Sequence, residues 1–194
     1  MSSPPIPPNA GLIITAHPGD SVWRAGGAIA LHARKGYRIK ILCLSYGERG
    51  ESQFAWKKAG VTMAEVKAQR RAEAEAAAHM LGAEIEFFDA GDYPLRTTPA
   101  MLDRTIDVFH ALNPAFVLTH ALEDPYNVDH PEAARFAQEA RIIAQAAGHK
   151  PDPNRAYAAP PVFLFEPHQP EQCNFKPNVI LNIDEVWEVK RKAF

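Results

Sequence analysis

The chain has 194 residues, of which 46% are hydrophobic and 23% charged, so it can bury the core of one domain and is neither disordered nor collagen-like. Its 21 basic and 23 acidic side chains give a net charge of -2, which leaves no basic surplus to attract nucleic acid or an anionic membrane. Cys43 and Cys173 are its 2 cysteines, which excludes a disulfide framework and a cysteine zinc cluster. We therefore expect a cytoplasmic protein that acts on a small molecule.

The two ends of the chain carry weak structural signals. Residues 1–10 are rich in proline, without a charged start or an apolar core, and no segment approaches the roughly 20 apolar residues that cross a bilayer. The sequence thus predicts neither export nor a membrane span. Residues 184–194 begin an amphipathic helix, with Val186 and Val189 on one face, that stops without a C-cap. We expect residues 1–194 to form a single α/β domain that is truncated at its C-terminus.

Short apolar runs alternate with segments of helical periodicity. The expected strands are residues 11–16, 39–44, 85–88, 116–119 and 162–165. The expected helices are one capped by Asp20 or Ser21 that runs to about residue 35, one over 63–81, one over 98–112, and one capped by Asp129 that runs to about residue 147. This alternation predicts a Rossmann-like, open and mostly parallel α/β sheet with helices on both faces. Neither GxGxxG nor GxxxxGK[ST] follows the first strand, which argues against dinucleotide and P-loop binding.

Histidines and carboxylates follow two of the strands, where ligands bind in open α/β sheets. His17 and Asp20 come directly after the first strand, and His130 lies in the polar segment 119–131 after the fourth. Two imidazoles and one carboxylate suit zinc with an open position, so we expect these three residues to be metal ligands and Asp129 to orient an imidazole. The same ligands would also take iron, cobalt or manganese. The competing interpretation makes Asp20 and Asp129 helix caps and leaves His130 exposed.

Further candidates follow the second and fifth strands. Glu48 and Arg49 lie in the glycine-containing segment 45–52, where Glu48 suits acid–base work and Arg49 suits a substrate carboxylate. His168 follows the fifth strand and is predicted to reach the same pocket. Arg24 is a second candidate for binding a carboxylate. The alternatives are a solvated Glu/Arg loop, a surface histidine and a partly exposed helix arginine.

Three segments together resemble a known family. AHPGD after the first strand, RRAEAEAAAHMLGAE before the third, and VLTHALEDPYNVDHPEA after the fourth are similar to the PIG-L/LmbE-like family of zinc-dependent enzymes. The resemblance implies zinc held by His17, Asp20 and His130. Deacetylases of that family carry AHPDD, whose first aspartate is the base, and here Gly19 replaces it. Many of them also have a histidine where this chain has Asn127.

Other segments resemble one branch of the family. LSYGERGES, DAGDYPL and FEPHQPEQCNFKP are similar to the 4-oxalomesaconate hydratases of gallate and protocatechuate catabolism. This resemblance implies zinc-dependent addition of water to the carbon–carbon double bond of a tricarboxylate, and a homo-oligomer. We expect Glu48 and His168 to divide the proton transfers, in an order left open, and Arg49, Arg24 and Asn127 to bind substrate.

Two other functions compete with the hydratase. One is an N-acetyl deacetylase of the same family in which Glu48 or another group replaces the missing aspartate, and acetate release would support it. The other is a non-catalytic module that binds a carboxylate metabolite, for which tight binding without turnover would be the sign.

Overall fold

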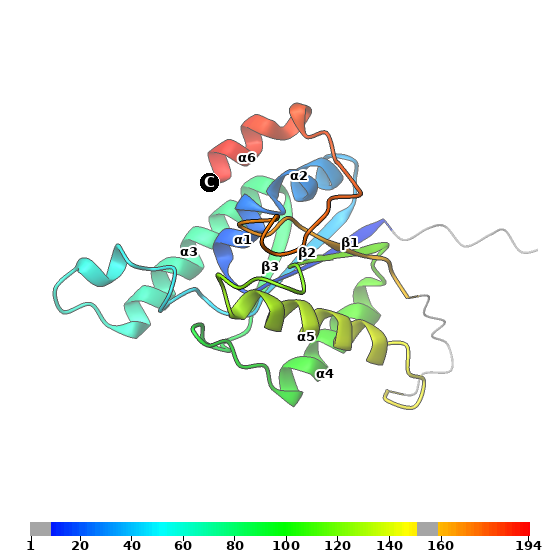
Figure 1. Ribbon diagram of the computed structural model, residues 1–194, viewed down its shortest axis with the longest axis horizontal. Helices are drawn as coiled ribbons and strands as arrows, with labels where there is room; N and C mark the ends of the chain where they lie inside the picture. The colour runs from blue at the N-terminus through cyan, green and yellow to red at the C-terminus, as the bar shows by residue number, and fades with distance from the viewer. Residues whose placement is uncertain (1–8, 151–158) are drawn as a thin grey trace, which may run out of the picture.

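The computed structural model describes residues 9–150 and 159–194, and its centre is a five-stranded sheet (Figure 1). The strands lie in the order β3-β2-β1-β4-β5, and every neighbouring pair is parallel. Their bounds are β1 Ala10–Thr15, β2 Arg38–Cys43, β3 Ala83–Phe87, β4 Phe116–Thr119 and β5 Val162–Leu164. This confirms the open, parallel α/β fold predicted from the alternation of strands and helices.

Helices cover both faces of the sheet (Figure 1). One face packs on α4 (Pro99–Leu112) and α5 (Asp129–Ile143), and the other on α1 (Pro18–Trp23), α2 (Gly26–Arg34), α3 (Met63–Leu81) and the terminal turns η2 (Asp184–Val186) and α6 (Trp187–Ala193). A further turn, η1, spans Ala55–Lys57. None of the described helices combines the length and apolar character that a bilayer span requires.

The alternation of side chains along β1 separates the two cores. Leu12 and Ile14 point toward α4 and α5, whereas Ile13 points toward α1, α2 and α3. All six residues of β1 are buried because neighbouring strands and both helical layers enclose it.

The predicted helix over residues 20–35 is two helices. Its start was wrong, because Pro18 occupies the first turn and the carboxylate of Asp20 accepts the backbone N–H of His17 at 3.0 Å. The chain then breaks at Arg24 and Ala25, just before a pair of glycines that begin α2. Asp20 is therefore fixed in the first turn of α1, one helical turn from the end of β1.

The predicted cap of α5 was also wrong. Val128 is the N-cap, and Asp129 is the first residue of the helix rather than its cap. The Asp129 carboxylate instead accepts the backbone N–H groups of Tyr93 at 2.8 Å and Leu95 at 2.7 Å. It therefore joins the loop after β3 to the start of α5. That helix ends at Ile143, earlier than the expected residue 147.

The ends of the chain agree with the sequence only in part. Residues 184–194 are helical as expected, divided into η2 and α6. The proline-rich leader falls on residues 1–8, which lie outside the described residues.

All five strands end at one edge of the sheet. The register pairs Thr15 with Cys43, Cys43 with Phe87, and Thr119 with Leu164. The chain crosses from β1 to β2 on one side and reaches β4 on the other, so β1 and β4 flank the switch point of the topology. Ligands bind at such points in open α/β sheets, and the loops after β1 and β4 meet there.

Candidate metal centre

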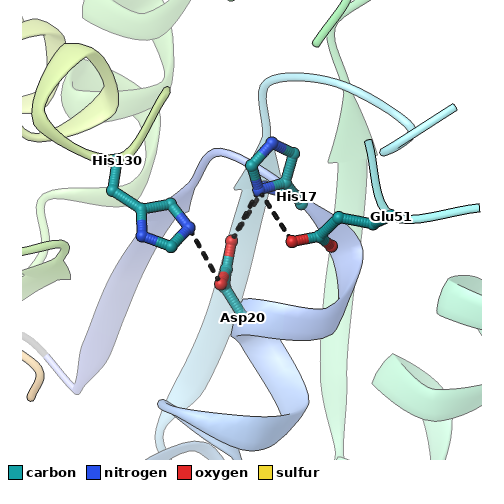
Figure 2. Close-up of side chains that lie close together, drawn as sticks. All are labelled: His17, Asp20, Glu51 and His130. Atoms are coloured by element: carbon teal, nitrogen blue, oxygen red, sulfur yellow. Dashed lines mark hydrogen bonds and ion pairs between the residues drawn. The ribbon is translucent and has the colours of Figure 1, made fainter. Parts of the chain in front are cut away.

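Four side chains converge at the switch point (Figure 2). They are His17, which follows β1, Asp20 in α1, Glu51 in the loop after β2, and His130 in α5. One ligand atom from each lies within 4.8 Å of the others. The structure therefore brings together all three residues that the sequence singled out as ligands, and adds Glu51.

The distances between these atoms fit a single small cation. His17 Nδ1 lies 3.4 Å from Asp20 Oδ2 and 3.2 Å from Glu51 Oε1, and His130 Nε2 lies 3.5 Å from Asp20 Oδ1. Ligands about 2.1 Å from a tetrahedral zinc are about 3.4 Å apart. His17 Nδ1 and His130 Nε2 are also buried without a hydrogen-bond partner, which is costly unless something else satisfies them. The donor set and its two unsatisfied nitrogens fit zinc.

Carboxylates hold the other nitrogen of each imidazole. His17 Nε2 lies 3.1 Å from Asp129 Oδ2, and His130 Nδ1 lies 2.8 Å from Asp124 Oδ2. A carboxylate behind a histidine fixes the tautomer and makes the free nitrogen a better ligand. Asp129 does what the sequence predicted in orienting an imidazole, and Asp124 is a second residue of this kind that the sequence did not identify.

The charges of the cluster are strongly perturbed. Burial alone would raise the pKa of Asp20, but the surrounding imidazoles outweigh burial and hold that pKa well below its usual range. Burial alone would lower the pKa of His17, yet the hydrogen bond to Asp129 and the nearby carboxylate of Asp20 raise it to about 10. Without a metal, the cluster therefore holds a proton on His17 beside an ionised Asp20, and a cation would replace that proton.

His120 packs against the His130 imidazole of the cluster. It is 2% exposed, its Nε2 accepts the backbone N–H of Ala16 at 3.0 Å, and its ring stacks on His130 with the centroids 4.1 Å apart. Burial lowers the pKa of His120 to about 4, so the ring is neutral at pH 7. His120 thereby joins the end of β4 to the end of β1.

Glu51 is the member of the cluster that sequence reasoning missed. It lies in the same segment as Glu48, and no spacing rule separated the two glutamates. Burial raises the pKa of Glu51 to about 7, and the charge of Asp20 adds to the effect. A Cβ built on Gly19 would lie 3.5 Å from Glu51 Oε2. The Glu51 carboxylate thus lies against the position where the family's deacetylases carry their aspartate.

Glu48 lies apart from the cluster. Its side chain is fully buried, Oε2 accepts the backbone N–H of Tyr46 at 3.2 Å, and Oε1 lies 3.6 Å from Lys67 Nζ. No contact joins Glu48 to the two histidines among the described residues. Its catalytic role stays a prediction.

His168 and Arg24 contact each other. Arg24 Nη2 lies 3.1 Å from His168 Nδ1, beside the ring of Trp23. Because a guanidinium only donates, His168 Nδ1 accepts, and the proton of the neutral ring is on Nε2. The roles predicted for the two residues stay predictions.

Arg49 and Asn127, predicted to bind substrate, make contacts within the protein. Arg49 Nη1 donates to the backbone oxygen of Asp92 at 2.7 Å, which joins the loops after β2 and β3. Asn127 Nδ2 donates to the hydroxyl of Tyr93 at 2.9 Å. Both side chains are therefore held close to the cluster through the loop after β3.

Comparison with known families agrees with this geometry. Residues 12–141 match the PIG-L family, described as GlcNAc-PI de-N-acetylase. The chain belongs to the PIG-L family. Its matched region begins in β1 and ends in α5, so it contains every member of the cluster.

Within the PIG-L family, the chain is similar to a hydratase sequence and to a hydratase crystal structure, both from Pseudomonas putida. It is 56% identical to a 4-oxalmesaconate hydratase, over 96% of this chain and 72% of the relative. It also superposes on the crystal structure of the 4-carboxy-2-hydroxymuconate hydratase with a TM-score of 0.92, covering 95% of this chain and 76% of that one.

Deacetylases share the fold at lower identity. The N,N'-diacetylchitobiose deacetylase of Pyrococcus horikoshii superposes with a TM-score of 0.77 and 23% identity, over 96% of this chain and 68% of that one. This likeness shows that the two proteins share a fold.

Proposed function

We propose that this protein is a hydro-lyase that adds water to 4-oxalomesaconate, or its tautomer 4-carboxy-2-hydroxymuconate, giving 4-carboxy-4-hydroxy-2-oxoadipate. The observation that carries the proposal is the 56% identity to a hydratase over 96% of the chain. Gly19 adds chemical support, because a glycine cannot take the proton that amide hydrolysis assigns to aspartate at that position. The deacetylase and the non-catalytic module are therefore disfavoured.

We assign zinc to the cluster, with His17, Asp20 and His130 as its ligands. The two unsatisfied imidazole nitrogens and the carboxylates behind them support this assignment. Bound there, zinc would act as a Lewis acid toward a substrate oxygen or the attacking water. With three protein ligands, a fourth position stays open for exchange.

We assign the two proton transfers of hydration to Glu51 and His168. Hydration forms a C–O bond at one alkene carbon and a C–H bond at the other, so water must lose one proton and carbon must gain one. Glu51 faces the cluster and is our choice for accepting the proton of water. His168 is our choice for the residue that delivers the proton to carbon, and Glu48 stays the alternative base.

Substrate carboxylates need cationic partners. Arg24 lies between α1 and α2, and its guanidinium contacts His168. We propose that Arg24 binds one carboxylate, while Arg49 contributes by holding the loops after β2 and β3 together. We further propose a cytoplasmic homo-oligomer built from a single domain, in keeping with the two free cysteines, Cys43 and Cys173.

Matched glutamate variants test the assignment. With zinc-loaded protein and the muconate substrate, Glu51→Gln is expected to lower kcat at least 100-fold, because a general base contributes about 10²–10⁴-fold. Glu48→Gln is the control and should retain most of the turnover. The product is identified by nuclear magnetic resonance, and acetate release from N-acetylglucosamine is measured in parallel. A larger loss in Glu48→Gln would move the base to Glu48, and acetate release without hydration would contradict the proposed function.

A further inference from the structure

Tyr93, in the loop after β3, lies over the metal cluster. Its ring stacks on His17 with the centroids 5.8 Å apart and an interplanar angle of 22°. The residue is 43% exposed, so one part of the ring covers a ligand imidazole while another part meets solvent. Tyr93 is therefore an aromatic side chain at the solvent side of the cluster.

The backbone holds Tyr93 in an unusual conformation. Its φ is +42°, in the left-handed region that tyrosine rarely adopts. The N–H of Tyr93 donates to Asp129 Oδ2 at 2.8 Å, and the same oxygen lies 3.1 Å from His17 Nε2. A Cβ on Gly50 would come within 2.1 Å of the ring, so the ring needs a glycine there. Strained residues of this kind persist where their surroundings hold them, often at functional sites.

The hydroxyl of Tyr93 is oriented by Asn127. Asn127 Oδ1 accepts the backbone N–H of Asp129 at 3.0 Å, which identifies the other end of the amide as its NH₂ group. That NH₂ group donates to Tyr93 Oη at 2.9 Å. Tyr93 Oη is thus an acceptor toward Asn127, and its own proton has no acceptor within residues 9–150 and 159–194. A phenol in this state can donate to an incoming oxygen anion, and the bond from Asn127 strengthens it as a donor.

We propose that Tyr93 Oη donates a hydrogen bond to a carboxylate of the substrate, and that Asn127 acts as a positioning residue by orienting this hydroxyl. The inference rests on the proposed function for the identity of the substrate. It changes the predicted role of Asn127, which has its oxygen engaged by Asp129 and one amide proton by Tyr93. Recognition then depends on a phenol presented over the cluster rather than on the amide itself.

Tyr93→Phe tests the proposal because it keeps the ring and removes only the hydroxyl. The probe is propane-1,2,3-tricarboxylate, a tricarboxylate without a double bond to hydrate, titrated calorimetrically into zinc-loaded protein. Its Kd should rise about tenfold or more in the variant, as expected for losing one hydrogen bond to a charged group. The KM for the muconate substrate should rise by a similar factor. Zinc content should stay at the wild-type value.

Tyr126→Phe is the matched control. Tyr126 is 48% exposed in the loop after β4, and its hydroxyl donates to Gln172. Its loss should leave probe binding and KM unchanged. Asn127→Ala should weaken binding in the wild type and have little further effect in Tyr93→Phe, because both act through one hydroxyl.

Three results would overturn the proposal: unchanged Kd and KM in Tyr93→Phe, a loss of zinc in that variant, or an equal effect of Tyr126→Phe. If wild-type protein binds the probe but does not hydrate the muconate, the proposed function fails and the Kd alone decides on Tyr93. If wild-type protein hydrates the muconate without binding the probe, the change in KM from wild type to Tyr93→Phe decides on Tyr93. If it does neither, both proposals fail.

Discussion

At the scale of single residues, we expect the carboxylates that contact the two imidazoles to control how the cluster binds a metal. Asp129 contacts His17 and accepts two backbone N–H groups of the loop after β3, so it leaves neither oxygen unused. Asp124 engages His130 at 2.8 Å. Asp129 therefore joins His17 to the loop after β3, and Asp124 joins His130 to the loop after β4.

Asp129→Asn is expected to weaken zinc binding by about 10–100-fold, the usual effect of losing a carboxylate behind a histidine ligand. An asparagine offers one oxygen where two are needed, so its NH₂ group would face a donor. Zinc affinity is measured by competition with a chromophoric chelator. Asp103→Asn is the control, because Asp103 also pairs with an imidazole, at 3.1 Å from His149 Nε2, but on the exposed surface. Equal affinity in wild type and Asp129→Asn would refute the role.

Zinc binding should also depend on pH. In the metal-free protein, the hydrogen bond to Asp129 and the nearby carboxylate of Asp20 overcome the effect of burial and raise the pKa of His17 to about 10. The stability that protonated His17 contributes is complete below about pH 6.5, its unfolded pKa, and is lost as pH rises toward 10. Zinc must displace this proton, so its affinity increases with pH over the same window.

The gain in Tm on adding zinc is therefore expected to grow between pH 6.5 and 8.5. Thermal unfolding with and without zinc measures this gain, and calorimetry in buffers of different ionisation enthalpy counts the protons released. A gain that is constant with pH, with no proton released, would show that His17 is not protonated in the metal-free protein.

The structure brings the three residues predicted as ligands close together, whereas two residues beside them were not predicted from the sequence. His17, Asp20 and His130 stand directly after strands or in the next helix, where the topology alone brings them together. Glu51 and Tyr93 belong to loops whose course depends on contacts far along the chain, such as the bond between Tyr93 and Asp129. Strand-end position carries no information about such contacts, which is why these residues were missed.

At the scale of elements, strands and helix ends differ in how well the sequence specifies them. The five strands were predicted to within one or two residues, and the clearest signal was the continuous apolar run of β1, which is buried on both faces. The cap at Asp129 was misassigned because its carboxylate accepts backbone N–H groups of the loop after β3. Asp20 is the third residue of its helix rather than the cap, and its carboxylate accepts the backbone N–H of the N-cap His17. The spacing of a helix cap therefore does not fix which backbone group the carboxylate binds.

Close packing of β1 predicts a sensitive glycine. A Cβ on Gly11 would lie 2.5 Å from Phe116 Cζ and 2.9 Å from Ile39 Cδ1. Gly11→Ala should therefore lower the free energy of unfolding by about 1–3 kcal/mol, the usual cost of overpacking a core. Gly148→Ala is the control, since no atom of the described residues lies within 4 Å of its added methyl. The urea midpoint measures both variants, and equal midpoints would contradict the packing.

At the scale of the whole molecule, the topology assembles the site. Parallel strands end at one edge, and the switch between β1 and β4 brings together loops separated by more than a hundred residues. A hydratase of Pseudomonas putida and a deacetylase of Pyrococcus horikoshii share this fold. We therefore expect side chains on the loops to set the reaction, and Gly19, Glu51 and Tyr93 lie on the loops and the helix start at the cluster.

If the cluster catalyses hydration with a metal held by His130, removing either the metal or this histidine must abolish turnover. The direct measurement follows the ultraviolet absorbance of the conjugated 4-carboxy-2-hydroxymuconate with zinc-loaded protein, chelated protein and His130→Ala. Absorbance should fall with the zinc-loaded wild type and persist in the other two samples, because water addition breaks the conjugation. An unchanged spectrum with zinc-loaded wild type would show that the protein does not hydrate this substrate. An equal loss of absorbance in all three samples would show that hydration needs neither the metal nor His130.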